Sequence, residues 1–324
     1  MEKLVCVTGA SGFIATWLVK LLLERGYTVR ASVRDPENAT KTAHLLGLPM
    51  AKERLKLFKA DLLDYGSFDA AVDGCEAVFH TASPFFFNTD NPEKDLIEPA
   101  VNGTRNVLNA CGKAKSVRRV IMTSSVAAVS YTPSRKPEDI VDESFFSDVV
   151  YCRQNNLWYQ SSKTEAEKEA WRIAKEQGLD LVTINPAMVI GPLLQPTLNT
   201  SSAAILRLLN GSTNTYLNVA LGWVHVKDVA EAHILAYEIG EASGRYICAE
   251  SIIHYERITQ MLRDLFPKYP IPSKCSDESS PRAPEYTICT DKVKSLGLKY
   301  TPIKQALIDT VESLVENKFL QKAD

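Results

Sequence analysis

The chain has 324 residues, 45% of them hydrophobic and 23% charged, a composition typical of a globular protein with one large domain and a smaller appendage. Its net charge of −2 at pH 7 argues against nucleic acid or an anionic membrane as a partner. No apolar run reaches the roughly 18 residues of a membrane span, and the first expected strand begins at Leu4, so we expect no signal peptide and a cytoplasmic protein.

The first part of the chain alternates between strand-like and helix-like stretches. Leu4–Thr8 is a short apolar run typical of a buried parallel strand, and the apolar residues of 12–25 recur at helical spacing. Further strands are expected at Thr28–Val33, Leu55–Lys59, Ala77–Phe79, Arg119–Thr123 and Leu181–Ile184, with intervening helices that include Asp95–Cys111 and Tyr159–Gln177. This alternation predicts an α/β fold of the Rossmann type, a doubly wound parallel sheet with helices on both faces.

The pattern changes after Gly191-Pro192. A helix is expected near Ser201–Leu209, a strand end followed by a helix in Val224–Tyr237, and beyond Ser251 the chain is helical and rich in loops. We therefore predict a larger unit made of 1–192 and 222–248. The second unit, made of 193–221 and 249–324, is expected to be smaller, discontinuous and mostly helical.

The turn between the first strand and the first helix reads TGASGFIA, at positions 8–15. Gly9 permits a tight turn, Gly12 lets the backbone approach a pyrophosphate, and Ala15 allows the helix to pack closely on the strand. The helix N-terminus then offers unpaired N–H groups to the anion. A purely structural turn is the alternative, but the position between a strand and a helix favours a dinucleotide site. The expected contacts are Gly9, Ser11, Gly12, Phe13 and Ile14.

Residues after the next two strands indicate the type of dinucleotide. NAD would call for an acidic side chain at the end of the second strand, whereas Arg34 stands there and Lys41 follows. Arg34 can clamp a 2′-phosphate and Lys41 can add a point charge, which predicts NADPH; the alternative is two surface charges. After the third strand, Asp61 with Leu62 could meet the adenine or cap a helix. The larger unit is then the NADP-binding domain and the smaller one the substrate-binding domain.

Tyr159 and Lys163 lie four residues apart on one face of an expected helix, with the lysine leaning back toward the tyrosine. Because a free tyrosine has a pKa near 10, we expect the ammonium to lower it so that protons can be exchanged at neutral pH. Ser125 ends a strand where open α/β sheets bind ligands and could steady charge on a substrate oxygen; Ser124 is the competing choice. We predict Tyr159 as the proton donor, with Lys163 and Ser125 as partners and Lys163 also holding the nicotinamide ribose.

Several blocks resemble, in order, the extended short-chain dehydrogenases/reductases, and within them the plant group of cinnamoyl-CoA reductases, dihydroflavonol reductases and phenylacetaldehyde or cinnamyl-alcohol-type reductases. The blocks are TGASGFIA, VRDP with Lys41, KADLLD at 59–64, FHTASP at 79–84, VNGTRNVL at 101–108, DESFFSD at 142–148, INPAMVIGP at 184–192 and WVHVKDVAEAH at 223–233. The resemblance implies the same catalytic and 2′-phosphate residues. It also implies cofactor contacts from Thr81, Ala82 and Ser83, and from Pro186 and Val189 at the nicotinamide.

Two departures from that group bear on the substrate. Cinnamoyl-CoA reductases carry NWYCYGK where this chain reads LWYQSSK at 157–163, and dihydroflavonol reductases carry asparagine where Ser130 stands. The resemblance thus implies a reductase of aldehydes or ketones with aromatic or other apolar groups; hydroxycinnamoyl-CoA or dihydroflavonol reduction is the alternative. Three consecutive aromatic residues from Phe85 to Phe87 cannot all face one core, so we expect some to line the pocket. The expected pocket residues are Phe85, Phe87, Ser125, Met188 and Trp223.

Other functions stay open at this point. One is a non-catalytic NADPH-binding module, and another is a nucleotide-sugar epimerase or dehydratase with tightly bound NAD, which Arg34 disfavours. Seven scattered cysteines without CxxC spacing indicate free thiols and no metal site. The segment Thr132–Asp148 could be a lid or a surface loop. The resembled cofactor site needs no second chain, which fits a monomer and leaves a dimer open.

Overall fold

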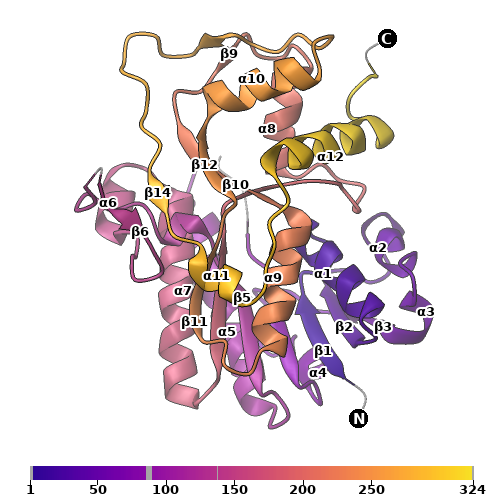
Figure 1. Cartoon of the computed structure of the whole chain (residues 1–324). Helices are drawn as coiled ribbons and strands as arrows, with labels where there is room; N and C mark the ends of the chain where they lie inside the picture. Colours follow the sequence, from indigo (N-terminus) through magenta and orange to yellow (C-terminus); the bar gives the residue numbers. More distant parts are fainter. Residues whose placement is uncertain (1–2, 85–89, 137, 323–324) are drawn as a thin grey trace.

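The computed structural model of the protein describes residues 3–84, 90–136 and 138–322. Its centre is a seven-stranded sheet in the order β11-β7-β5-β4-β1-β2-β3, with every neighbouring pair parallel (Figure 1). The strand order reverses at β1, the position at which doubly wound sheets bind ligands. The strands are β1 (Leu4–Thr8), β2 (Thr28–Val33), β3 (Leu55–Lys59), β4 (Ala77–His80), β5 (Arg119–Thr123), β7 (Leu181–Pro186) and β11 (Gly244–Cys248).

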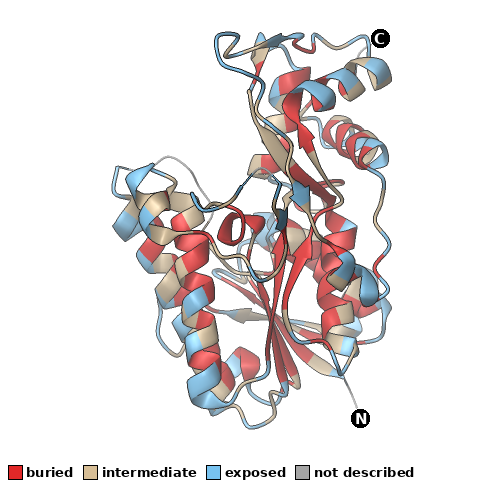
Figure 2. Ribbon diagram, turned by 60° about the vertical axis from the view of Figure 1, so that its left-hand side comes forward, coloured by how far each residue is buried: buried red, intermediate tan, exposed pale blue. Residues whose placement is uncertain are grey.

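Helices cover both faces of this sheet. On one face α1 (Phe13–Glu24) packs against α9 (Val226–Glu238), and on the other α5 (Glu98–Lys113) packs against α7 (Trp158–Gln177). Alternate residues of a strand point to opposite faces, so β1 contributes Val5 to the α1/α9 core and Cys6 to the α5/α7 core. Buried residues accordingly fill the layers between sheet and helices (Figure 2). The predicted doubly wound α/β fold is confirmed.

Several elements of this part differ from the sequence-based expectation. The strand β11 was not expected, because its five residues GRYIC mix a charge with apolar residues. The expected helix at 95–111 begins instead as a π-helical turn, η1 (Glu93–Ile97), which leads into α5. Short helices that carry too few turns for a periodic pattern are α2 (Ala39–Leu46), α3 (Ala51–Arg54), α4 (Asp69–Val72), η2 (Val126–Ala128) and α6 (Val149–Gln154).

The second part of the chain contains small sheets as well as helices. A three-stranded sheet has the order β12-β10-β8, β13 pairs with β9, and β14 pairs with β6. Strands of two residues have no alternation to detect, which is why the expectation was mostly helical. These elements are β6 (Ile140–Val141), β8 (Met188–Ile190), β9 (Thr215–Tyr216), β10 (Ala220–His225), β12 (Ser251–His254), β13 (Lys274–Cys275), β14 (Thr287–Ile288), α8 (Thr200–Leu209), α10 (Tyr255–Leu265), α11 (Asp291–Ser295) and α12 (Ile303–Glu316).

The division into two domains stays a prediction, and two features bear on it. The helices α8, α10 and α12 lie together beyond the carboxyl ends of the large sheet (Figure 1). The strand β14, from the C-terminal stretch, returns to pair with β6 in the first half of the chain.

All seven cysteines carry free thiols. Within the described ranges, no helix has the length and apolar character needed to cross a bilayer.

A buried aspartate in the first turn of α9 connects the two parts. Asp228 is 6% exposed, and its carboxylate accepts hydrogen bonds from the Thr301 amide at 2.7 Å and the Thr301 hydroxyl at 2.9 Å. We expect Asp228→Ala to lower the free energy of unfolding by about 2 kcal/mol, because it leaves the amide and the hydroxyl of the half-buried Thr301 without their acceptor. Urea denaturation measures this, with Glu241→Ala on the exposed surface as control. An unchanged denaturation midpoint would show that the contact is dispensable.

Candidate active site

The glycine turn after β1 is held against the loop after β4. Gly9 has a φ of +62°, and a Cβ at this position would lie 2.9 Å from the Ala82 Cα. The Thr8 hydroxyl oxygen accepts hydrogen bonds from the amides of Thr81 and Ala82, both at 3.1 Å, and the Thr81 hydroxyl donates to the Thr8 carbonyl. The two stretches that were expected to contact the cofactor therefore form one surface, and only glycine fits at its tightest point.

The N-terminus of α1 opens directly from this turn. Gly12, the residue before the helix, has extended backbone and no side chain to cap it, and its amide donates to the Gly9 carbonyl at 3.0 Å. The amides of the first helical turn have no partners within the helix, so they are available to an anion. Ser11 and Ile14 are half-buried, whereas Phe13 is buried in the core and offers the site its backbone.

The two residues predicted to bind a 2′-phosphate are both exposed. Arg34 follows β2 and Lys41 lies in α2, and in the described part of the chain neither side chain forms an ion pair. The end of β2 is tied to the turn, because the Ser32 carbonyl accepts from the Ala10 amide at 3.0 Å. An exposed guanidinium at this strand end fits the 2′-phosphate of NADP(H) and not the free ribose hydroxyl of NAD(H).

Asp61 and Leu62 follow β3, as expected, and have structural contacts of their own. The Asp61 carboxylate accepts from the Leu63 amide at 2.9 Å, which is the geometry of an Asx turn. The Leu62 carbonyl accepts from Asn106 Nδ2 at 2.7 Å, and the Leu62 side chain packs on Gly103 of α5, where a Cβ would lie 2.8 Å away. Their predicted contact with the adenine stays a prediction.

The three predicted catalytic residues come together. Ser125 follows β5, and its hydroxyl group lies close enough to the hydroxyl group of Tyr159 on α7 to act on the pKa of that phenol. Lys163, one helical turn further along, is 3% exposed and donates from Nζ to the Thr123 carbonyl at 3.0 Å. Ser125 and Tyr159 are half-buried, so a phenol, a hydroxyl and a buried ammonium meet at the carboxyl end of the sheet.

The protonation of these groups differs from the expectation in one respect. Burial raises the pKa of Tyr159 to about 12, and the nearby hydroxyl of Ser125 acts in the opposite direction. Burial lowers the pKa of Lys163 to about 8, while the negative charge of Glu167 acts to raise it. The expected lowering of the tyrosine pKa by the lysine is therefore wrong for the protein chain by itself, because desolvation of the phenol dominates.

The competing serine has a different environment. Ser124 is 4% exposed, and its hydroxyl donates to the buried carboxylate of Glu167 at 2.5 Å. The neighbouring Thr123 hydroxyl forms a hydrogen bond with His233 Nε2 of α9, at 2.7 Å. Since His233 Nδ1 bonds the Val229 carbonyl, Nε2 is the acceptor of the Thr123 hydroxyl. Of the two serines, Ser125 is the one that contacts Tyr159.

The predicted substrate-pocket residues are only partly placed. Phe85 and Phe87 lie outside the described residues. Met188 is half-buried in β8, opposite Trp223 in β10. Trp223 is fully buried, stacks edge-on against Tyr255 at 5.5 Å and bonds the Ile253 carbonyl through Nε1, which is the position of a core residue. The predicted nicotinamide contacts Pro186 and Val189 are both buried where β7 leads into β8.

Sequence reasoning missed several polar residues around the catalytic set: Thr8, Asn185, Glu167 and Arg245. One of them carried a signal, because Glu167 follows Tyr159 and Lys163 at the same four-residue spacing and so shares their helix face. Arg245 carried none, since only the pairing of β11 with β7 brings it to the site.

The sequence and the fold of this chain are both similar to those of known proteins. Residues 5–249 match the NAD dependent epimerase/dehydratase family. A cinnamoyl-CoA reductase of Medicago truncatula is 56% identical over 320 residues, 98% of either chain. Vestitone reductase from alfalfa (Medicago sativa) has a TM-score of 0.84 at 34% identity, covering 98% of this chain and 99% of that one. The yeast methylglyoxal/isovaleraldehyde reductase Gre2, solved with NADPH, has the same TM-score and coverage at 30% identity.

Proposed function

Since the chain belongs to the NAD dependent epimerase/dehydratase family, in its extended short-chain dehydrogenase/reductase branch, we propose that it reduces an aldehyde or ketone to the alcohol with Tyr159 as the proton donor. As an NADP-dependent oxidoreductase of this branch, it acts on a carbonyl substrate. The observation that carries the proposal is the convergence at one strand end of Ser125, the nearby phenol of Tyr159 and the buried Lys163, whose Nζ donates to the Thr123 carbonyl at 3.0 Å.

The proton transfer follows from the protonation of these groups. With a pKa of about 12, Tyr159 holds its proton at neutral pH, as a proton donor must. Bound NADPH supplies the hydride that adds to the carbonyl carbon. Tyr159 gives its proton to the carbonyl oxygen, and the hydroxyl of Ser125 stabilises the charge on that oxygen. The ammonium of Lys163 favours the phenolate that Tyr159 leaves behind, until solvent returns the proton.

The cofactor preference is testable at the exposed cations Arg34 and Lys41. We expect Arg34→Ala to raise the KM for NADPH about tenfold or more, because it removes charge-assisted hydrogen bonds to a 2′-phosphate, and Lys41→Ala to do so less strongly. The KM for NADH, which lacks this phosphate, should stay the same. Steady-state kinetics with both cofactors measure the change, and Lys115→Ala serves as a control on an exposed lysine elsewhere. Equal losses with both cofactors would contradict the assignment.

The substrate is proposed to carry an aromatic or other apolar group next to its carbonyl. Support comes from the reductases of methylglyoxal, isovaleraldehyde and vestitone that share the fold, and from Ser161-Ser162 where cinnamoyl-CoA reductases carry other residues before the catalytic lysine. A second candidate substrate is a hydroxycinnamoyl-CoA thioester, which the 56% identity with a cinnamoyl-CoA reductase favours. There the hydride would add to the thioester carbon, the carbon–sulfur bond would break, and the aldehyde and free CoA would leave.

An NADPH-oxidation screen decides between these candidates. Aromatic aldehydes, aliphatic aldehydes, dihydroflavonols and hydroxycinnamoyl-CoA esters would be compared by kcat/KM, with release of CoA thiol followed separately. The proposal expects the highest kcat/KM with an aromatic or apolar aldehyde or ketone. A higher value with a CoA ester selects the second candidate. NADPH binding without turnover of any carbonyl would indicate a binding protein without catalysis.

A further inference from the structure

The helix α7 carries a third ionisable residue in line with the two predicted catalytic ones. Tyr159, Lys163 and Glu167 follow one another at four-residue intervals, so they lie along one face of the helix. Glu167 is fully buried, and Arg245 of β11 is 6% exposed. The proton transfer proposed above uses neither residue. Burying a carboxylate costs several kcal/mol of desolvation, which only well-placed partners can offset. The contacts of Glu167 therefore indicate which part of the structure it holds in place.

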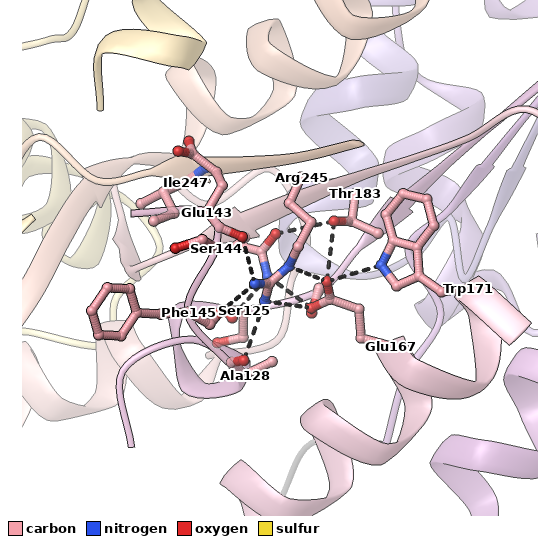
Figure 3. A network of polar contacts seen from close by, with 12 residues as sticks. Ser125, Ala128, Glu143, Ser144, Phe145, Glu167, Trp171, Thr183, Arg245 and Ile247 are labelled. Carbon is pink, nitrogen blue, oxygen red and sulfur yellow. Dashed lines mark hydrogen bonds and ion pairs between the residues drawn. The ribbon is translucent and has the colours of Figure 1, made fainter. Parts of the chain in front are cut away.

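The Glu167 carboxylate gathers polar groups from three strands (Figure 3). Its partners come from β7 and β11, from the residue that follows β5, and from α7 itself. They are Ser124 Oγ at 2.5 Å, Asn185 Nδ2 at 2.9 Å, Thr183 Oγ1 at 3.3 Å, Arg245 Nε at 2.6 Å and Trp171 Nε1 at 3.3 Å. A carboxylate has about four lone-pair sites. Both of its oxygens are therefore fully used, and the side chain is fixed in position.

The Arg245 guanidinium continues the network toward the loops above the sheet (Figure 3). It donates to the carbonyls of Ala128 at 3.2 Å, Glu143 at 3.0 Å and Phe145, and it lies 3.7 Å from the centroid of the Phe146 ring. Ala128 belongs to the turn directly after Ser125, and 143–146 belong to the segment considered as a lid. Arg245 therefore fastens that segment to the turn that carries the serine.

Two contacts connect the ion pair of Glu167 and Arg245 to the predicted catalytic groups. Asn185, held by Glu167, also donates to the main-chain carbonyl of Ser125 at 3.2 Å. Ser124, held by Glu167 through its hydroxyl, is the neighbour of Ser125 in the chain. Two residues of α7 thus bind the strand end 123–125. Lys163 donates to the Thr123 carbonyl, and Glu167, one turn later, accepts from the Ser124 hydroxyl.

We propose that the buried ion pair of Glu167 and Arg245 is a positioning element of the active site, which fixes the Ser125 strand end against α7 and keeps Lys163 charged. This inference rests on the proposed roles of Tyr159, Lys163 and Ser125. A buried ion pair is weak evidence for stability in itself, whereas its contacts here converge on the strand end that carries Ser125. Glu167 and Arg245 act through these neighbours and are positioning residues, not catalytic ones.

The charge environment of Lys163 gives this role a distinct signature. The ionisable groups near it are His80 on β4, Tyr159 and Glu167 on α7, and the two more distant residues that contact its partners, His233 on α9 and Arg245 on β11. Burial lowers the pKa of His80 to about 3 and that of His233 to about 4, so both are neutral at working pH. Glu167 is therefore the negative charge that favours the ammonium form of Lys163, and Arg245 opposes it.

The test is Glu167→Gln, which keeps the shape and removes the charge. Because Lys163 loses its favourable partner and Arg245 stays charged, the pKa of Lys163 falls further. The basic limb of the kcat/KM profile should then move to lower pH by about one pH unit. We expect kcat to fall at least tenfold while the KM for NADPH stays within about twofold, since the 2′-phosphate and turn contacts are remote. Glu169→Gln is the matched control, because it makes the same change two residues away, at a carboxylate that pairs with Arg105 and Arg172 on the surface. It should alter neither kcat nor the position of the basic limb.

A second variant separates position from charge. Arg245→Lys keeps a positive charge but loses the planar fork that reaches three carbonyls, so we expect a severalfold loss of kcat with the basic limb unchanged. NADPH titration counts the folded sites of each variant, and kcat is expressed per site. A Glu167→Gln enzyme with fewer sites but wild-type kcat per site and an unmoved basic limb would overturn the positioning role.

If Glu167→Gln does not fold, Ser124→Ala decides the question with a smaller change: a severalfold loss of kcat supports the role and wild-type kcat overturns it. The two proposals also fail separately. Undiminished turnover in Tyr159→Phe contradicts the catalytic assignment. Loss of turnover in Tyr159→Phe, combined with wild-type kcat and pH profile in Glu167→Gln, contradicts only the positioning role.

Discussion

Replacing Tyr159 with phenylalanine is expected to lower kcat about a thousandfold, because general acid catalysis by a positioned side chain contributes on the order of 10² to 10⁴. The substitution removes the hydroxyl that lies next to Ser125 and leaves the ring in place. The turn at Gly9 and the cations at Arg34 and Lys41 are untouched, so the Kd for NADPH should stay within about twofold. Fluorescence titration gives the Kd, and stopped-flow or steady-state assays give the turnover.

The control for this variant is Tyr131→Phe. Tyr131 lies close enough to Tyr159 to act on the pKa of that phenol, yet it has no place in the proposed proton transfer. Its replacement should leave kcat within about twofold of the wild type. If Tyr159→Phe turned over as fast as the wild type, the proton would have to come from elsewhere, and the catalytic assignment would be wrong.

The second large effect is expected at Gly9. Gly9→Ala adds a Cβ that would lie 2.9 Å from the Ala82 Cα, at a φ of +62°. The left-handed backbone alone costs about 1 kcal/mol for a side chain, and the two loops must also separate to relieve the clash. Since both loops form the cofactor surface, we expect the Kd for NADPH to rise more than tenfold and the free energy of unfolding to fall by about 2 kcal/mol.

The matched control is Gly240→Ala, where a Cβ meets nothing within 4 Å and the backbone is not left-handed. This variant should bind NADPH normally and unfold at the same urea concentration as the wild type, or slightly above it. Fluorescence titration and urea denaturation apply to both variants. Normal NADPH affinity in Gly9→Ala would mean that the turn does not carry the dinucleotide.

The parts of the fold that follow from local pattern could be predicted from the sequence. Apolar runs and apolar–polar alternation both indicate strands locally, so Thr28–Val33, Leu55–Lys59 and Arg119–Thr123 were predicted with the bounds that the structure has. The pairing of Tyr159 with Lys163 follows from the helical repeat alone. Their meeting with Ser125 follows from the rule that ligands bind at the carboxyl ends of the strands.

The parts that depend on distant pairing could not be predicted. Arg245 enters the site because β11 pairs with β7, and no local pattern in its five residues indicates this. The pKa of Tyr159 was expected to be low from the charge of Lys163, whereas burial, which depends on the whole fold, dominates. Trp223 was expected near the substrate, but the sheet of β8, β10 and β12 places its ring in the core.

The pairing of β14 with β6 has a consequence for how the protein is made. Ile140–Val141 finds its partner at Thr287–Ile288, almost 150 residues later in the chain. During synthesis on the ribosome, β6 therefore cannot pair until most of the polypeptide has emerged. Contacts of such long sequence separation slow folding and prolong exposure of partly folded intermediates. In nascent chains that end before residue 287, the cluster of Val126, Val141 and Ile288 next to Ser125 would be incompletely assembled, whatever the state of the large sheet.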